Sequence, residues 1–178
     1  MPEHKEAHEN GIILVVDDEA DLRELVQSIL CEVTPQVITA ADGVEALELF
    51  QAHRPHAIVS DLKMPRKGGL ELLSDLRSLQ EQVPFVIVTG YEDKESLLAG
   101  IRLGASDFLE KPFRPEYLQE VMRKALGLGL AQSQLEKNLE ALYEDAELPR
   151  DQIDRMRRIR SAILRMKYEN ALHKRKVG

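Results

Sequence analysis

Short apolar runs alternate with amphipathic stretches over residues 12–126, and this alternation restricts the fold more than any other feature of the sequence. Most of the runs are rich in Val and Ile with little polar interruption, which is typical of strands covered on both faces. The expected strands are Ile12–Val16, Gln36–Ala40, Ala57–Ser60, Phe85–Val88 and Phe108–Leu109. The expected helices are Ala20–Glu32, Val44–His53, Leu70–Gln80, Lys94–Leu103 and Pro115–Leu126. Five strand–helix pairs in succession predict an α/β protein with a doubly wound, five-stranded parallel sheet and a C-terminal α-helical extension.

Right-handed crossovers between parallel strands leave few topologies, and we expect the strand order 2-1-3-4-5 with the second strand at an edge. In that order the first and third strands flank the switch point, and ligands bind beyond their carboxyl ends. Asp17 and Asp18 follow the first strand, and Asp61 follows the third. The topology therefore predicts that three carboxylates meet at one edge of the sheet.

These carboxylates suit the transfer of a phosphoryl group to an aspartate. Such a transfer needs a nucleophile, a divalent cation that neutralises phosphate oxygens, and a further donor or positive charge. Asp61 is the candidate nucleophile, because a carboxylate can form an acyl phosphate. Asp17 and Asp18 are adjacent hard-oxygen donors, of the kind that Mg²⁺ prefers.

Two more polar blocks, Thr89-Gly90 and Lys111-Pro112, follow the fourth and fifth strands. Lys111 supplies a positive charge that can pair with phosphate. Thr89 offers a hydroxyl, and Gly90 leaves space beside it. Each block alone is a weak signal, but their combination at the ends of different strands is specific for an aspartate phosphorylated with the help of a divalent metal.

In these blocks the chain closely resembles the response-regulator receiver domain of bacterial two-component signalling, a flavodoxin-like fold, from about Gly11 to Leu126. The matching blocks are Ile12–Asp18, Ala40–Gly43 with Glu45–Leu47, Asp61–Pro65 with Gly69, Val88–Gly90, Gly104-Ala105 and Lys111–Phe113. The residues before Gly69 depart from the family pattern, since Lys67 and Gly68 stand where a hydrophobic residue and an acid are common.

The resemblance implies a role for each site residue. Asp61 would receive phosphate from a sensor histidine kinase or a phosphotransfer protein, in the cytoplasm. Mg²⁺ or Mn²⁺ would be arranged by Asp17, Asp18, Asp61 and the backbone carbonyl of Lys63. Thr89 and Phe108 would form the switch pair, Lys111 would contact the phosphate, and the bond before Pro112 would be cis.

Two other interpretations of the site stay open. Aspartyl-intermediate phosphatases also place carboxylates and Mg²⁺ at strand ends, but they usually carry a second acid two residues after the nucleophile, where this chain has Lys63. We therefore expect a phosphoacceptor that at most phosphorylates itself from small donors and dephosphorylates itself, not an enzyme. The chain could also be a fragment that lacks a larger output domain.

The C-terminal part carries apolar residues at alternating spacings of three and four, which is typical of helices that pair. One stripe continues from the fifth helix through Leu135, Leu139 and Leu142, and a second follows Leu148-Pro149 with Met156, Ile159, Ile163 and Met166. Glycines at 127 and 129 weaken the helix between the domain and the first stripe. We favour a helical hairpin or coiled coil that forms a homodimer, such as a bundle of four helices from two chains, and contacts a protein output partner. The alternative is that the two helices pack on each other and on the receiver domain.

The charge of the chain is divided unevenly. Residues 150–178 contain ten Lys or Arg against three Asp or Glu, a net charge of +7, whereas residues 1–149 carry −14. DNA binding through the basic C-terminal helix is therefore the alternative output. It is the weaker interpretation, because the sequence shows no three-helix unit with a Gly-containing turn, and Asp151, Asp154 and Glu169 reduce the positive charge of the basic face.

We expect three parts: a polar tail at 1–10, the receiver domain at 11–127, and a helical output or dimerisation segment at 128–178. The first ten residues are polar and show no secretory leader. Apolar runs are too short to span a membrane, so we expect a soluble cytoplasmic protein. Cys31, the only cysteine, is expected to be a buried helix residue.

Overall fold

The computed structural model describes residues 11–79, 81–90, 94–145, 149–156, 158–159 and 162. Its strands are β1 (Ile12–Val16), β2 (Gln36–Ala40), β3 (Ala57–Asp61), β4 (Phe85–Thr89) and β5 (Asp107–Glu110). Its helices are α1 (Ala20–Leu30), α2 (Gly43–His53), α3 (Gly69–Ser78), α4 (Lys94–Arg102) and α5 (Pro115–Asp145). All strand pairs are parallel, and the order is β2-β1-β3-β4-β5. The predicted fold class, strand order and edge position of β2 are confirmed.

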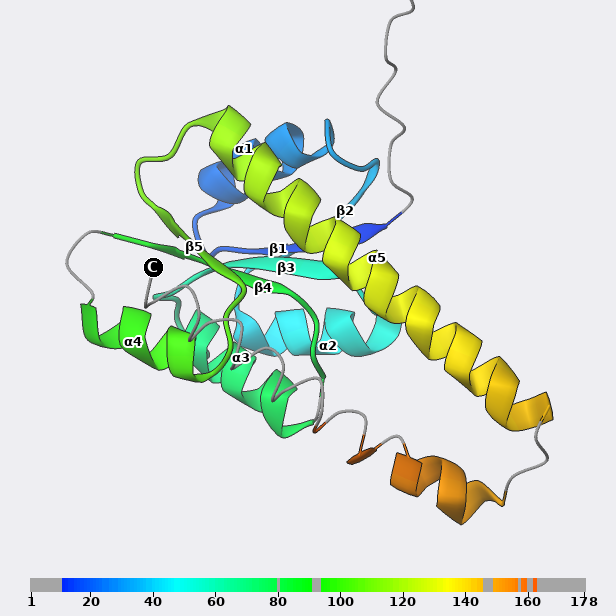
Figure 1. The fold of residues 1–178 in the computed structure, drawn as a ribbon. Helices are drawn as coiled ribbons and strands as arrows, with labels where there is room; N and C mark the ends of the chain where they lie inside the picture. Colours follow the sequence, from blue (N-terminus) through cyan, green and yellow to red (C-terminus); the bar gives the residue numbers. More distant parts are fainter. Residues whose placement is uncertain are drawn as a thin grey trace, which may run out of the picture.

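The helices cover the sheet in two layers (Figure 1). One core cluster joins β-strand side chains to α1 and α5, including Leu30 and Leu118, both fully buried. The other cluster joins the opposite side chains of the strands to α2 and α3, including Phe50 and Leu73. Because both faces are covered, the central strands are apolar along nearly their whole length.

Residues with known preferences for helix ends stand where the helices begin and end. Asp42 caps α2, since its side chain accepts hydrogen bonds from the amides of Val44 and Glu45. Gly104, just after α4, has φ 79°, a left-handed conformation that suits glycine. Pro115 is the first residue of α5, and the Lys111-Pro112 peptide bond is cis. Cys31 differs from expectation: it is exposed, because it caps the C-terminus of α1 on the solvent side.

Helix α5 continues far beyond the point where the glycines were expected to weaken it. It runs for 31 residues without a break through Gly127 and Gly129. Gly129 is buried, and a Cβ there would lie 1.7 Å from the carbonyl oxygen of His56. Glycine is present because the helix packs directly on the backbone before β3, and this close approach outweighs its poor helix propensity. The division between a domain ending at 127 and a separate helical segment stays a prediction.

Residues 150–156 form the start of the second C-terminal helix, in which Met156 is 41 % exposed and Ile159, further along, is 51 % exposed. Ile163 and Met166 of the predicted stripe lie outside the described residues, as does the polar tail at 1–10. No helix within the described ranges is long and apolar enough to cross a membrane.

Candidate phosphoacceptor site

Strand register brings the predicted site residues to one edge of the sheet. Val16 pairs with Ser60, so the residues that follow them, Asp17 and Asp61, emerge side by side. Asp61 in turn pairs with Val88 of β4, and Thr89 pairs with Glu110 of β5, directly before Lys111. Parallel strands thus bring together Asp17, Asp61, Thr89 and Lys111 from the ends of four strands that are far apart in the sequence.

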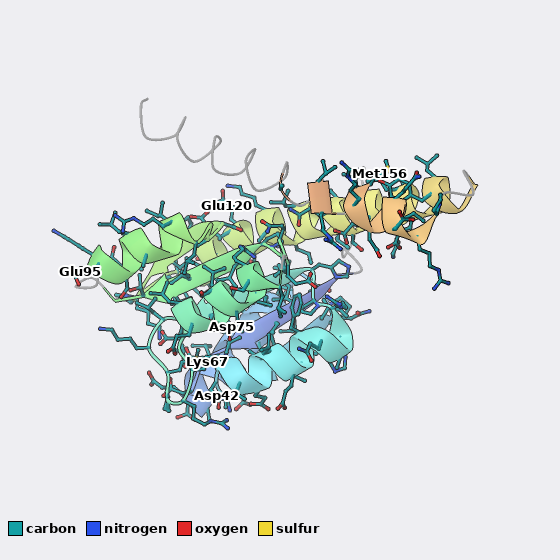
Figure 2. The ribbon with its side chains drawn as sticks, turned by 90° about the horizontal axis from the view of Figure 1, so that it is seen from below. Asp42, Lys67, Asp75, Glu95, Glu120 and Met156 are labelled. Atoms are coloured by element: carbon teal, nitrogen blue, oxygen red, sulfur yellow. The ribbon has the colours of Figure 1, made fainter. Side chains whose placement is uncertain are left out.

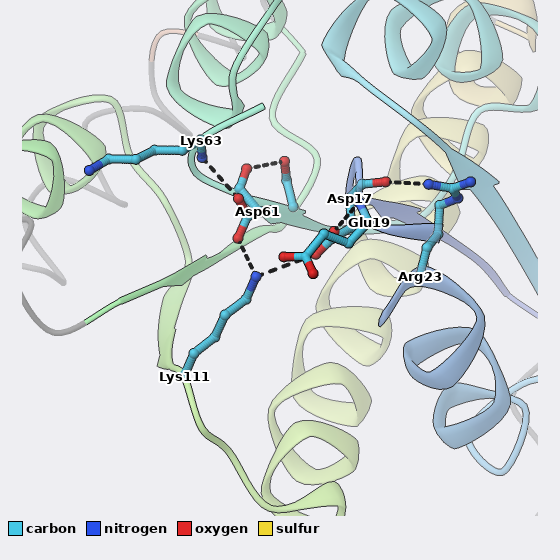
Figure 3. Close-up of polar contacts among 7 residues, drawn as sticks. Asp17, Glu19, Arg23, Asp61, Lys63 and Lys111 are labelled. Atoms are coloured by element: carbon cyan, nitrogen blue, oxygen red, sulfur yellow. Dashed lines mark hydrogen bonds and ion pairs between the residues drawn. The ribbon is translucent and has the colours of Figure 1, made fainter. Parts of the chain in front are cut away.

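The Lys111 ammonium lies between two carboxylates (Figure 3). Its Nζ is 2.6 Å from Oδ1 of Asp61 and 3.5 Å from Oδ2 of Asp17. The second oxygen of Asp61 accepts a hydrogen bond of 3.0 Å from the amide of Lys63, and Oδ1 of Asp17 accepts one of 2.9 Å from the amide of Glu19. Both carboxylates are therefore held in fixed orientations. The Lys63 side chain points away from Asp61 in Figure 3.

The electrostatics of the site disfavour ionised Asp17. Burial raises the pKa of Asp17, and the nearby charge of Asp61 raises it further, while the amide of Glu19 and the charge of Lys111 lower it only in part. For Lys111, burial alone would lower the pKa, but the hydrogen bond and charge of Asp61, with the charge of Asp17, raise it overall. Two carboxylates thus share one positive charge, so the site attracts further positive charge.

Asp18 is placed differently from the other two acids. Its side chain is exposed, and within the described part of the chain no three His, Cys, Asp or Glu side chains form a ready-made metal site. The structure brings Asp17 and Asp61 together around Lys111 but leaves Asp18 outside such a group. Asp18 and the Lys63 carbonyl as metal ligands stay predictions.

The predicted switch residues are close to the site without touching Asp61 in any described contact. The Thr89 hydroxyl donates a hydrogen bond of 3.2 Å to the carbonyl of Gly90, and the Thr89 carbonyl accepts one of 2.9 Å from the amide of Lys111. A Cβ at Gly90 would meet nothing within 4 Å, so crowding does not require glycine there. Phe108 is half-buried, and its ring faces Gly100 of α4, where a Cβ would lie 3.0 Å from Cε1.

Sequence reasoning missed the contacts that hold the β3–α3 loop beside Asp61. Arg66 forms an ion pair with the buried Asp42, and Lys67 forms one with Asp75 of α3. Figure 2 shows Asp42, Lys67 and Asp75 on the same side of the molecule. Gly69 is needed for close packing, because a Cβ there would lie 2.3 Å from the carbonyl oxygen of Asp61. The capping pattern at Asp42 was a visible signal, but its ion-pair partner was not.

Comparison with known proteins agrees with this fold. The sequence profile of the response regulator receiver domain matches residues 13–123. A probable transcriptional regulator ycf27 of Porphyridium aerugineum is 39 % identical over 114 residues, covering 64 % of this chain and 47 % of that protein. The response regulator MprA of Mycobacterium sp. (strain KMS) is 42 % identical, covering 64 % and 50 %. The crystal structure of the receiver domain of NtrX from Brucella abortus matches with a TM-score of 0.61 and 36 % identity, covering 65 % of this chain and 98 % of that one.

The fold and site define a doubly wound α/β protein with a paired-carboxylate centre at its switch point. With the profile match over more than half its length, the chain belongs to the response regulator receiver domain family. It spans about half the length of the curated relatives it matches.

Proposed function

We propose that this protein is a two-component response regulator that accepts a phosphoryl group on Asp61. The observation that carries the proposal is the Lys111 ammonium 2.6 Å from Asp61 and 3.5 Å from Asp17, at the carboxyl ends of adjacent parallel strands. Family membership supports the same role. Asp61 is 13 % exposed, so a donor can approach it from the edge of the sheet.

The donor is a phosphohistidine of a sensor kinase or phosphotransfer protein. A carboxylate oxygen of Asp61 attacks the phosphorus, a P–O bond forms and the P–N bond breaks. The electron pair stays on the leaving imidazole nitrogen, which takes a proton from solvent. Lys111 is positioned to neutralise part of the negative charge on the transferred group, and the amide of Lys63 holds Asp61 in place.

The residues at this site fit a divalent cation. Receiver domains typically bind Mg²⁺ at the phosphorylation site. The Asp17 carboxylate is buried beside that of Asp61, and the charge of Asp61 raises its pKa, so a second cation would relieve repulsion between hard-oxygen donors. Asp17, Asp18, Asp61 and the Lys63 carbonyl would hold Mg²⁺ or Mn²⁺, which when bound neutralises phosphate oxygens during transfer.

Phosphorylation of Asp61 adds about −1.5 to −2 charge and new acceptor oxygens. The Thr89 hydroxyl, which donates to the neighbouring Gly90 carbonyl at 3.2 Å, turns toward them. Phe108 then moves into the space that Thr89 leaves and away from Gly100, so the surface of α4, β5 and α5 changes. The continuous α5 carries the change toward the C-terminal helices, through which the chain forms a homodimer and contacts a protein partner.

Labelling by a small phosphodonor tests the phosphoacceptor role. We expect acetyl phosphate with Mg²⁺ to add one phosphoryl group to the wild type, and Asp61→Asn to lower the labelled fraction to background. Intact-mass spectrometry measures the addition. The exposed Asp21→Asn serves as the matched control and should label like the wild type. Equal labelling of Asp61→Asn would refute the proposal, as would labelling that does not require a divalent cation.

The buried, ionised carboxylate of Asp17 should destabilise the folded protein when no metal is bound. Because its pKa is higher in the folded protein than in the unfolded chain, protonation of Asp17 favours folding at low pH, and this contribution is lost as the pH rises through the folded pKa. In EDTA at neutral pH, Asp17→Asn should therefore raise the free energy of unfolding by about 0.5–2 kcal/mol, as replacement of a destabilising functional residue commonly does. The exposed Asp18→Asn should change it by less than about 0.5 kcal/mol.

Adding Mg²⁺ should make the wild type more stable than both variants, which reverses the order of stability expected for Asp17→Asn in EDTA. At a concentration 100 times its Kd, Mg²⁺ should stabilise the wild type by about 2.7 kcal/mol. Both Asp17→Asn and Asp18→Asn should lose most of that gain. Denaturant titrations with EDTA and with Mg²⁺ measure both effects, and a wild type that is insensitive to Mg²⁺ would contradict the assigned metal site.

A further inference from the structure

The β3–α3 loop, residues 62–68, is fastened at its middle to the turn that precedes α2. The guanidinium of Arg66 forms an ion pair with the carboxylate of Asp42, whose side chain is only 5 % exposed. One residue further along, the carbonyl of Lys67 accepts a hydrogen bond of 3.0 Å from the amide of Gly43. A Cβ at Gly43 would lie 2.9 Å from that carbonyl oxygen, so the two backbones are in direct contact. We call this ion pair and hydrogen bond the loop latch.

Arg66 holds a backbone conformation that residues with a Cβ avoid. Its φ is 62°, in the left-handed region, where glycine would be free of the steric cost. Its side chain is 65 % exposed, so burial of apolar surface does not explain an arginine at this position. Strained backbone of this kind persists where surrounding contacts hold it, and it is concentrated at functional sites. The contact that the Arg66 side chain contributes is the ion pair with Asp42.

Asp42 uses its two carboxylate oxygens for different purposes. Oδ1 accepts hydrogen bonds of 2.8 Å and 3.1 Å from the amides of Val44 and Glu45, and thereby caps α2. Oδ2 faces the guanidinium of Arg66. An asparagine would cap the helix as well as an aspartate does, and a buried charge is costly unless it is paired. The helix cap alone therefore does not require a charge at Asp42, whereas the pairing with Arg66 does.

The loop latch lies on the segment that presents the amide of Lys63 to the phosphoacceptor candidate (Figure 3). That amide donates a hydrogen bond of 3.0 Å to Oδ2 of Asp61, and the bond is exposed to solvent. Lys63 precedes Arg66 by three positions in the loop. The two ends of the loop are joined to each other, because the amide of Gly69 donates to the carbonyl of Leu62 at 3.1 Å. With its ends and its middle held, the loop keeps the Lys63 backbone in one place.

We propose that the loop latch positions the Lys63 backbone for phosphoryl transfer to Asp61. Asp42 and Arg66 are then positioning residues, which act on the reaction through Lys63. The inference rests on the proposed phosphoacceptor function. The Lys63 backbone serves that function twice, because its amide orients the Asp61 carboxylate and its carbonyl is a proposed ligand of the cation. Reacting groups that are displaced slightly from their productive geometry react more slowly, so a loosened loop should slow the transfer.

The rate of labelling by acetyl phosphate at saturating Mg²⁺ tests the loop latch. We expect Asp42→Asn and Arg66→Gly each to lower the rate constant about 10-fold, an effect typical of a small misplacement of reacting groups. Asparagine keeps the cap of α2 but turns a donor toward Arg66, and glycine suits the left-handed backbone, so both variants should stay folded. Arg66→Lys keeps the positive charge and should retain a rate within about 3-fold of the wild type.

Arg54→Gly is the matched control. Arg54 also has a left-handed backbone, with φ 49°, and its side chain is likewise 65 % exposed and paired with an acid, Glu81. It lies before the start of β3, whereas Asp61 ends that strand, so its replacement should leave the rate unchanged. The double variant Asp42→Asn/Arg66→Gly should be no slower than either single variant, because all three lose the same contact.

Exchange of the Lys63 amide with solvent gives a second readout that does not require the reaction. In EDTA, NMR should show this exchange about 10-fold faster in both single variants and unchanged in Arg54→Gly, because the amide is protected only while the loop is held. If either the labelling rate or the exchange rate of the single variants stays at the wild-type value, the inference is overturned and the phosphoacceptor role stands. A double variant slowed by the product of the two single effects also overturns it. A wild type that acetyl phosphate does not label refutes the proposed function itself, and the inference with it.

Discussion

Replacing Arg77 with methionine should lower the free energy of unfolding by about 3–5 kcal/mol, because it removes the donor from one buried and three partly buried carbonyl groups. Arg77 lies in α3 and is only 7 % exposed. Its guanidinium donates to the carbonyls of Glu81 and Val83 before β4, and to those of Leu103 and Gly104 after α4. One side chain therefore joins the end of α3, the start of β4 and the end of α4.

The positive charge of Arg77 also stabilises this arrangement. The carbonyl groups at the end of α4 carry the negative end of the helix dipole, which stabilises a cation. Methionine fills much of the same volume but donates nothing, so the loss reports hydrogen bonds and charge rather than a cavity. Lysine keeps the charge but reaches fewer acceptors, and Arg77→Lys should lose about half as much stability.

Urea denaturation of the three proteins measures these differences. Arg114→Met is the matched control, because Arg114 is exposed, and its effect should stay within about 0.5 kcal/mol. A loss for Arg77→Met as small as that of the control would show that the carbonyl contacts contribute little. Arg77→Lys stays informative if the methionine variant does not fold.

The role of Arg77 could not be predicted from the sequence, whereas the layout of the sheet could. Short Val- and Ile-rich runs separated by amphipathic stretches are local signals, and parallel sheets obey strict topological rules, so strand order followed from them. Arg77 contacts Leu103 and Gly104, 26 and 27 residues away, only after the whole fold is formed. From the sequence alone, Arg77 is indistinguishable from the other polar residues of an amphipathic helix.

In the candidate site, too, the sequence predicts where the backbone places the residues but not how their side chains are oriented. Asp17, Asp61 and Lys111 come together because each follows a strand of the predicted sheet, and backbone register alone places them. The direction of each side chain depends on local hydrogen bonds, such as that from the Lys63 amide to Asp61. Side-chain direction was therefore not predictable, and Asp18, adjacent to Asp17 in the chain, is turned to solvent instead.

The continuity of α5 was the main structural feature that the sequence obscured, and Gly129→Ala should reveal its cause. In most helices this change stabilises by about 1 kcal/mol, because alanine has the higher helix propensity. Here a Cβ would lie 1.7 Å from the carbonyl oxygen of His56 and 2.7 Å from its carbonyl carbon. We expect the opposite sign, a loss of about 2–3 kcal/mol, as is typical of an overpacked contact.

His56 cannot move away to make room for the added methyl group. Its amide donates to the carbonyl of Ile12 at 2.8 Å, and its Nδ1 accepts from the amide of Ile12 at 3.1 Å. The helix must therefore lift from the domain at this point. Ala131 is an exposed residue on the same helix, so Ala131→Gly measures the difference in helix propensity alone. It should lower the free energy of unfolding by about 1 kcal/mol.

Titration of His56 by NMR distinguishes a displaced helix from a general loss of stability. Burial lowers the pKa of His56, and the positive charge of Lys137 on α5 lowers it further. If α5 lifts in Gly129→Ala, His56 becomes solvated and Lys137 moves away, so the pKa should rise toward its ordinary value. In Ala131→Gly the helix stays seated and the pKa should not change. A Gly129→Ala protein that is more stable than the wild type, with an unchanged His56 titration, would mean that α5 does not rest on this backbone.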